Sequence, residues 1–187
     1  PEQASDENYE DVLEISGNLQ VTIENLLTLA RLEKGRAEIS KEEVNLRAIV
    51  SECWEPFQLK AEERNLRFEM EIEESKRLLT DPKLIRLILS NLLSNAADYT
   101  PEGAAIVVTA DDPESILCVS NPAPHLKESD IPLLFDRLWR HDEARTDSSH
   151  SGLGLSLART CAEVLELSLS AGLEKGSLTF CLKLSEK

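Results

Sequence analysis

Aromatic residues and glycines are scarce in this chain of 187 residues, which holds 4% aromatics and seven glycines. With 41% hydrophobic residues, its core must be mainly aliphatic, and a disordered chain is excluded. No apolar run approaches the roughly 18 residues of a membrane-spanning helix, and the opening residues do not read as a signal peptide. Basic residues are also few, since 20 Lys and Arg face 35 Asp and Glu and leave a net charge of −15. Such a charge repels polyanions, so we expect neither nucleic acid nor anionic lipid as a partner.

Cysteines and histidines in metal-binding arrangements are missing as well. The cysteines form no CxxC pair, and the three histidines show no zinc-binding spacing. We therefore predict reduced, buried thiols in a cytoplasmic protein. The cysteines are Cys53, Cys118, Cys161 and Cys181.

The start of the chain predicts one long helix at about 9–34, preceded by a frayed polar end at 1–8. Apolar residues recur along it at spacings of three and four, a stripe typical of a coiled coil or helical bundle. Gly35 suits the end of this helix. A stripe of this kind needs a partner surface. Its members are Val12, Ile15, Leu19, Ile23, Leu26 and Ala30.

Beyond Gly35 the pattern predicts an α+β two-layer sandwich, with helices and strands joined by short turns. Asn45 and Asp81 are placed to cap the first two helices of this part. Residues 141–151 are polar apart from Ala144, and we expect a mobile loop there. The first helix should bury Leu46, Ile49, Val50, Trp54 and Leu59. Helices are expected at about 45–64, 82–98, 129–140 and 152–165, and strands at 66–72, 105–110, 115–120, 167–171 and 177–184.

The helix expected at 82–98 carries an unusual polar stripe. A solvated surface would explain it, but surface helices usually carry Lys and Glu there, and asparagine is a poor helix former. Two asparagine oxygens one turn apart can instead hold a magnesium ion and its waters. The stripe consists of Asn91, Ser94, Asn95 and Asp98, at i, i+3, i+4 and i+7.

These residues carry a resemblance to a known family. The stretch Asn91-Leu-Leu-Ser-Asn95-Ala-Ala-Asp-Tyr99-Thr-Pro-Glu-Gly103 resembles the N box of the sensor histidine kinases, which share an ATP-binding fold with the gyrase, mismatch-repair and heat-shock chaperone ATPases. Further motifs follow in the family's order. Residues 134–140 resemble the F box, 141–151 take the place of the ATP lid, 151–158 resemble the second glycine box, and Thr179-Phe180 resembles the end of the third.

The resemblance extends to the arm, because residues 26–35 are similar to the end of the second helix in the kinases' dimerisation hairpin. It therefore implies two parts: a helical arm at 1–38 and a catalytic ATP-binding domain at 39–187, with the ATP lid at 141–151.

Roles for single residues follow from the resemblance. It implies that Asn95 binds Mg²⁺, that Asn91 lies near the phosphates of ATP, and that Tyr99 packs near the ribose and base. A glycine pair would let the backbone approach the triphosphate at a helix N-terminus, where free amides favour anions. The residues assigned to the nucleotide are Asn91, Asn95, Asp98, Tyr99, Asn121, Ala123, His125, Leu126, Arg137, Arg140, Gly152, Leu153, Gly154, Leu155 and Thr179, with Asn95 as the metal ligand.

Alternatives stay open for several of these residues. Arg137 and Arg140 can offset phosphate charge or form surface salt bridges with nearby acidic residues. Phe135 and Trp139 are expected in the core rather than stacked on the base, and Thr179 is expected near the adenine.

The sequence also departs from the family. Residues 121–126 replace the usual Asp-x-Gly-x-Gly of the first glycine box and hold no glycine, which resembles the box of some metal-responsive sensor kinases. Asn121 can still accept the hydrogen bond of the adenine amino group, and His125 is expected as a turn residue. Asp98 stands where the family usually has Lys or Arg, so its carboxylate should repel phosphates unless Mg²⁺ intervenes.

The phosphate acceptor of the family, a histidine in a context like His-Glu-x-x-x-Pro, has no counterpart among the three histidines. We therefore expect a fragment of a longer, membrane-anchored receptor that forms a homodimer through its helical hairpin. The implied function is transfer of the ATP γ-phosphoryl group to a histidine, for relay to a response-regulator aspartate.

Two alternatives remain. One is a degenerate module for dimerisation and for docking of a response regulator or support of its dephosphorylation. The other is a hydrolytic ATPase of the gyrase type. It is disfavoured because those enzymes have a glutamate as general base four residues before the metal-binding asparagine, and this chain has Asn91 at that position, which cannot take a proton.

Overall fold

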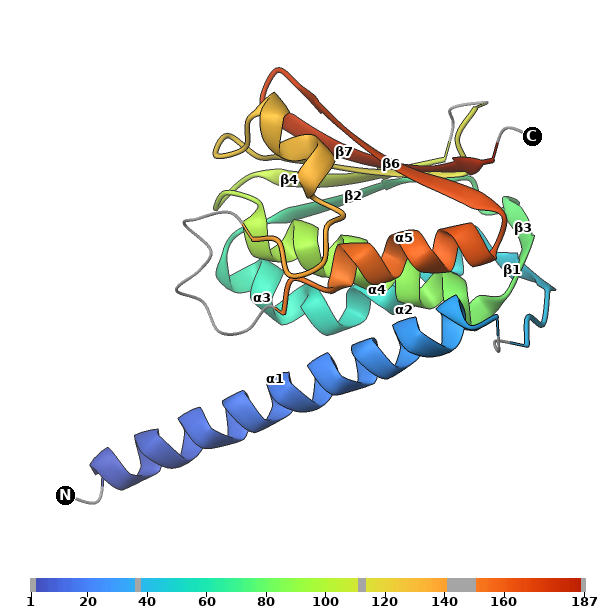
Figure 1. The fold of residues 1–187 in the computed structure, drawn as a ribbon. Coiled ribbons are helices and arrows are strands. Elements are labelled where there is room, and N and C mark those ends of the chain that lie inside the picture. Colours follow the sequence, from blue (N-terminus) through green and yellow to red (C-terminus); the bar gives the residue numbers. More distant parts are fainter. Residues whose placement is uncertain (1–2, 36–37, 111–113, 141–150, 186–187) are drawn as a thin grey trace.

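A computed structural model describes residues 3–35, 38–110, 114–140 and 151–185, with backbone alone for 3–15 and 18. It shows two layers, a mixed sheet covered on one face by helices, and a long helix, α1, running beneath the helical layer (Figure 1). The predicted α+β two-layer sandwich is confirmed. Its elements are α1 (Gln3–Glu33), β1 (Glu42–Asn45), α2 (Leu46–Trp54), η1 (Glu55–Phe57), α3 (Gln58–Glu63), β2 (Arg67–Glu71), β3 (Arg77–Thr80), α4 (Pro82–Tyr99), β4 (Ala105–Thr109), β5 (Leu117–Pro122), η2 (Glu128–Leu133), α5 (Gly154–Val164), β6 (Leu167–Glu174) and β7 (Ser177–Leu184).

The main sheet has the strand order β2-β4-β5-β7-β6. Its first pair is parallel and the other three are antiparallel. Side chains alternate along β7, where Leu178, Phe180 and Leu182 are buried and the residues between them are partly exposed. One face of the sheet therefore meets the helices and the other faces outward. A small second sheet pairs β1 with β3.

Helix α4 forms the centre of the helical layer, because it packs against both α2 and α5 and carries Ile88 and Leu92 with no exposed surface. Its polar stripe faces away from this core. Asp81 begins the helix as predicted, since its carboxylate accepts hydrogen bonds from the backbone N–H groups of Lys83 and Leu84 at 2.9 and 3.1 Å.

The pKa of Asp81 reflects its role as a cap. Burial by itself raises the pKa of this carboxyl, but backbone N–H groups of Ser40, Leu84 and Lys83 outweigh burial and hold the pKa below its ordinary value. A lowered folded-state pKa means that this stabilisation is present above the unfolded-state pKa of about 3.9 and is lost as pH falls through the folded-state pKa.

The single helix predicted at 45–64 is wrong in part. Asn45 caps α2 as predicted, accepting from Ala48 N at 2.9 Å, but α2 ends at Trp54. Pro56 then lies in the 3-10 turn η1, because its missing N–H cannot continue an α-helix. The chain changes direction there, so Leu59 on α3 is 69% exposed rather than buried.

Other expectations differ in detail. Strands β1 and β3 were not predicted, and the helix expected at 129–140 is the 3-10 segment η2 followed by turns, with Pro132 inside it. Helix α1 begins at Gln3, so most of the predicted frayed end is helical. The expected loop at 141–150 and turn at 111–113 lie outside the described residues.

Helix α1 packs against α5 through its last turns, where Leu29 and Leu32 are buried in the hydrophobic core. The four described members of the predicted stripe are not covered by the domain: Leu19, Ile23 and Leu26 are 59%, 48% and 48% exposed, and Ala30 is exposed as well. Among the described residues, no helix combines the length and apolarity needed to cross a membrane.

The prediction of four reduced thiols is wrong for two of them. Cys118 on β5 and Cys181 on β7 form a disulfide bond, because the antiparallel register places them directly opposite each other. Cys53 and Cys161 are free and buried, as predicted.

Candidate functional site

A cavity of about 200 Å³ opens at the C-terminal end of α4. Its walls come from α4, the turn after β5, the turn that leads into α5, and the middle of α1. Eleven of the fifteen residues assigned to the nucleotide from the sequence line this cavity. They are Asn91, Asn95, Tyr99, Asn121, Ala123, His125, Leu126, Arg140, Gly152, Gly154 and Leu155.

The α4 wall presents its polar stripe to the cavity. Asn91, Ser94 and Asn95 line it, as expected from their shared helix face. The Asn91 side-chain amide donates to Leu87 O at 2.7 Å, which fixes the orientation of this carboxamide and leaves its oxygen for other contacts.

Asp98 ends the stripe but is not part of the cavity wall. Lys60 of α3 forms an ion pair with one of its carboxylate oxygens, and Ser94 Oγ donates to the other at 3.1 Å. The Asp98 side chain is 9% exposed, whereas the Lys60 side chain is 47% exposed, so the carboxylate is buried and its lysine partner reaches it from the surface. The expected repulsion of phosphates is therefore opposed by a lysine that is distant in sequence.

The turn into α5 approaches α4 very closely. A Cβ atom at Gly154 would lie 2.5 Å from the side-chain oxygen of Asn91, so no other residue fits there without displacing that asparagine. Gly152 has a φ of +67°, and a Cβ on it would lie 2.9 Å from Leu138 Cα. Gly152 is thus required by the backbone geometry, and Gly154 by the neighbouring Asn91 side chain. They bring the N-terminus of α5, with its free amides and positive dipole end, to the cavity.

At the opposite end of the cavity lies Asn121, the last inward-facing residue of β5. It is 2% exposed, and its amide nitrogen donates to Pro122 O at 3.1 Å. Its side-chain oxygen is buried without a hydrogen-bond partner among the described residues. A buried acceptor left unpaired costs free energy, roughly 1–3 kcal/mol. The site can therefore take a hydrogen-bond donor that the described residues do not supply.

Aromatic side chains also line the cavity. The rings of Tyr99 and His125 lie 6.1 Å apart, centroid to centroid, and both residues line the cavity together with Trp139. Phe135 instead packs edge-on against Phe180 of the core at 6.0 Å, as predicted. The guanidinium of Arg159 lies 4.9 Å from the centre of the Phe135 ring.

The remaining assigned residues lie elsewhere. Thr179 is on the outer face of the sheet, where its hydroxyl forms a 2.9 Å hydrogen bond with Ser120 Oγ, and its neighbour Leu178 lines the cavity instead. Arg137 forms an ion pair with Glu33 of α1. Leu153 is 1% exposed and belongs to the core.

Sequence reasoning missed several lining residues. Leu178 could have been found from the alternation of β7, which points every second residue inward. Val21 and Asn25 had no such signal, because they belong to α1, and only the packing of that helix against the domain brings them to the cavity. The others are Leu134, Trp139 and Ser151; Ser94 also lines the cavity, and it belongs to the predicted polar stripe although it was not among the residues assigned to the nucleotide.

The oxygen donors on the α4 wall are neutral amides rather than a cluster of carboxylates. Among the described residues, no group of three or more His, Cys, Asp or Glu side chains is placed to hold a metal ion. Asn91 and Asn95 supply two amide oxygens to the cavity. Such a set suits a hard cation that takes its remaining ligands from water or from a bound anion, as Mg²⁺ usually does.

Comparison with known proteins identifies a family that matches the part of the chain holding most of this cavity. The family described as histidine kinase-, DNA gyrase B-, and HSP90-like ATPase matches residues 80–187. The sensor protein VanSB of Enterococcus faecalis is 33% identical over 149 residues, covering 78% of this chain and 33% of that protein. The sensor histidine kinase CusS of Escherichia coli O157:H7 is 31% identical over 163 residues, covering 83% and 34%.

The fold also has close solved counterparts. The structure of full-length ShkA in complex with AMPPNP superimposes with a TM-score of 0.74 at 23% identity, covering 100% of this chain and 40% of that one. The chain spans about a third of the length of the two curated relatives, 33% and 34%.

Proposed function

The chain belongs to the histidine kinase-, DNA gyrase B-, and HSP90-like ATPase family, and we propose that it is the ATP-binding catalytic part of a sensor histidine kinase. In this proposal the domain at 39–187 binds ATP with Mg²⁺, and the arm at 1–38 is the second helix of a dimerisation hairpin. The curated relatives support the kinase assignment, because CusS is named a sensor histidine kinase.

The buried, unpaired oxygen of Asn121 carries the proposal. An exocyclic amino group on a purine would supply the hydrogen bond that this acceptor lacks, and Tyr99 and His125 would flank the base and ribose. Asparagine replaces the aspartate that the family usually has here, but it keeps the acceptor oxygen that adenine requires.

The other end of the cavity suits the triphosphate. The N-terminus of α5 offers free amides and a positive dipole end, and Arg140 adds positive charge. Gly152 and Gly154 let the turn before α5 lie against Leu138 and Asn91, which places this helix end at the cavity. Asn95, with Asn91 one turn earlier, would hold Mg²⁺ between the protein and the phosphates. These local features offset a net charge of −15 that would otherwise repel ATP.

ATP supplies the phosphoryl group, and this part of the chain positions it and stabilises its charge. None of the three histidines has the sequence context of an acceptor, so the acceptor would come from another segment of the same receptor or from its partner subunit. The product would be a phosphohistidine that passes its phosphoryl group to a response regulator. Because ATP and response regulators are cytoplasmic, the domain would work on that side of the membrane.

The test is calorimetric titration of the full chain with a non-hydrolysable ATP analogue and Mg²⁺. The parent should bind the ATP analogue better than the inosine analogue, which lacks the exocyclic amine. Asn121→Ala should bind the ATP analogue about tenfold more weakly and lose this preference, since one hydrogen bond to a buried acceptor is worth roughly 1–2 kcal/mol. Asn95→Ala should abolish the Mg²⁺ dependence of binding.

Ser120→Ala is the matched control, because Ser120 is the neighbour of Asn121 on the outward face of β5. This variant should leave the affinities for the ATP analogue and the inosine analogue unchanged. Absence of binding at millimolar analogue would contradict the proposal and favour the degenerate docking module. Equal binding by Asn121→Ala and the parent would refute the role given to that residue.

A further inference from the structure

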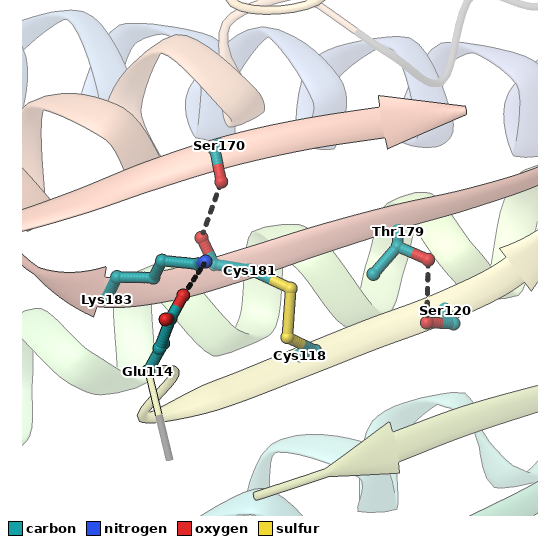
Figure 2. The surroundings of a disulfide bond; sticks show 7 residues. All are labelled: Glu114, Cys118, Ser120, Ser170, Thr179, Cys181 and Lys183. Carbon is teal, nitrogen blue, oxygen red and sulfur yellow. Dashed lines mark hydrogen bonds and ion pairs between the residues drawn. A yellow bond between two sulfur atoms is a disulfide. The ribbon is translucent and has the colours of Figure 1, made fainter. Parts of the chain in front are cut away.

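The disulfide bond Cys118–Cys181 joins strands β5 and β7 (Figure 2). Asn121 and Leu178, on the opposite face of the same strands, line the cavity. The two cysteines lie directly opposite each other on β5 and β7, with Cα atoms 4.2 Å apart. This is the short spacing of a non-hydrogen-bonded pair in an antiparallel ladder. The strand register therefore holds the two sulfur atoms within bonding reach, although 63 positions separate them in sequence.

The bond lies on the face of the sheet that the helices do not cover. Leu117 and Val119, the neighbours of Cys118, point into the core, so Cys118 itself points outward. Helices α2 to α5 lie on the other side of the sheet (Figure 1). Cys118 is 8% exposed and Cys181 is more exposed than that. A small thiol can therefore reach the bond from solvent without unfolding the domain.

The groups around the bond are small or solvated. Figure 2 shows the hydrogen-bonded pair Ser120–Thr179 on one side and the ion pair Glu114–Lys183 on the other. The Glu114 side chain is 84% exposed, so this ion pair is weak and easily moved.

The two remaining cysteines cannot react in the same way. Cys53 and Cys161 are 6% and 0% exposed. Burial raises the pKa of the Cys161 thiol to about 12 and also raises that of Cys53, so both stay protonated near neutral pH. Thiol–disulfide chemistry in the folded chain is thus confined to one pair.

The same two strands form the base end of the cavity. Asn121 and Leu178 are paired in the β5–β7 ladder three positions from the disulfide, and both line the cavity. Between them and the disulfide stands the Ser120–Thr179 pair, hydrogen-bonded at 2.9 Å. A covalent link at Cys118–Cys181 therefore restricts the spacing of the strand pair that holds the unpaired Asn121 oxygen in place.

We propose that Cys118–Cys181 is a reversible thiol–disulfide site through which a cellular dithiol controls nucleotide affinity, an inference that rests on the proposed function. A thiolate of the dithiol attacks Cys181, the more exposed cysteine; its sulfur forms a mixed disulfide, and Cys118 leaves as a thiolate that takes up a proton. The second thiol of the dithiol then displaces Cys181, which also ends as a thiol. The dithiol is oxidised to a disulfide and the protein gains two electrons and two protons.

The oxidised form is the one with the ordered cavity wall. Because a ligand binds a preorganised site at lower cost in conformational entropy, the oxidised chain should bind ATP more tightly than the reduced chain. Disulfides in a reducing compartment are usually transient and redox-sensing, which agrees with this assignment if the domain is cytoplasmic.

The experiment compares the full chain oxidised and after reduction with dithiothreitol, without denaturant. Alkylation followed by peptide mass mapping should label Cys118 and Cys181 on reduction and leave Cys53 and Cys161 unlabelled. Reduction should weaken binding of the ATP analogue about fivefold or more, the lower range of ordinary coupling between sites. Reoxidation should restore the affinity.

A Cys118→Ser, Cys181→Ser double variant should bind like the reduced parent and ignore dithiothreitol. If the bond is reduced and affinity does not change, the coupling is refuted. If the bond yields only in denaturant, the reversible site is refuted and the disulfide is structural. Hydrogen exchange of β5 and β7 in both redox states gives a readout that needs no nucleotide. If the chain binds no ATP, the proposed function is refuted, and the redox site is still tested by the protection of these two strands.

Discussion

Asp98 and Asn121 both depart from the family pattern, but the structure compensates for the charge of Asp98, and Asn121 keeps an acceptor oxygen in the cavity. At position 98 a carboxylate replaces a basic residue, and Lys60 and Ser94 bind its two oxygens. Arg64 adds further positive charge nearby, because it donates to the backbone oxygens of Asp98 and of two other residues at the C-terminal end of α4. The local charge near the cavity is therefore set by α3 and α4 together.

This balance can be tested with the Lys60–Asp98 pair. Lys60→Met removes the ion-pair partner of Asp98 and should weaken binding of the ATP analogue by about three- to tenfold, the range expected for a partly screened charge. Asp98→Asn should bind at least as well as the parent, and the double variant should recover most of the loss. Calorimetric titration at low and high salt measures these changes.

Glu63→Gln, on the same short helix, serves as the control for α3 and should leave the affinity unchanged. A double variant that binds as weakly as Lys60→Met would show that Lys60 acts by itself rather than by neutralising Asp98.

Among the elements, α1 combines two kinds of surface. Its last turns belong to the core, since Leu29 and Leu32 are 2% and 5% exposed. Farther toward its N-terminus, Val21 and Asn25 line the cavity while Leu19 and Ile23 are exposed to solvent. The helix is therefore attached to the domain at one end and keeps an apolar stripe available, which agrees with the proposed hairpin partner.

Leu29→Ala should release this helix. Loss of a buried leucine removes roughly 2–5 kcal/mol of packing, and because α1 is held mainly through α5, the helix can open locally without unfolding the sheet. Amide hydrogens in the second half of α1 should exchange at least about tenfold faster, while those of β5 and β7 keep their protection. Hydrogen exchange with mass spectrometry resolves the two regions.

The comparison variant is Leu27→Ala, on the same helix but 53% exposed, which should change neither region. Equal acceleration of α1 and the sheet in Leu29→Ala would show that the arm and the domain unfold as one unit, contrary to the proposed boundary near residue 38.

For the whole molecule, the disulfide is the long-range covalent constraint. It closes a loop with a sequence separation of 63 that contains η2, α5 and β6. A constraint of this length limits the unfolded chain more than it changes the folded one. Its effect on stability is thus separate from its proposed effect on the cavity.

The Cys118→Ser, Cys181→Ser variant should be less stable than the oxidised parent by about 4 kcal/mol, from the chain entropy of a loop of this size. Urea unfolding under non-reducing conditions measures the difference, and the slope of the transition should be steeper for the variant because its unfolded state is less compact. Thr179→Val, which removes the neighbouring hydrogen bond without altering the chain connectivity, should cost about 1 kcal/mol. A loss below about 1 kcal/mol in the double serine variant would contradict a stabilising disulfide.

Local signals in the sequence were sufficient for the elements around the site. The cap Asp81, the apolar periodicity of 82–98 and the alternation in β7 predict structure through neighbours a few positions away, and these predictions are confirmed. The resemblance assigned Asn91 and Gly154 to the same nucleotide, and both residues line the cavity. Where a local rule was not applied, as at Pro56, the predicted helix was too long.

Contacts between distant segments required the tertiary structure. The pairing of Cys118 with Cys181, the neutralisation of Asp98 by Lys60 and the approach of Asn25 to the cavity all join residues far apart in sequence. Strand register and helix packing determine them, and neither is encoded in the spacing of nearby residues. The sequence by itself determined the fold class and the polar stripe of α4, because both follow from local periodicity. The tertiary structure alone decided the charge balance at Asp98, the cavity wall formed by α1 and the pairing of Cys118 with Cys181. These three features depend on which surfaces of the folded chain meet.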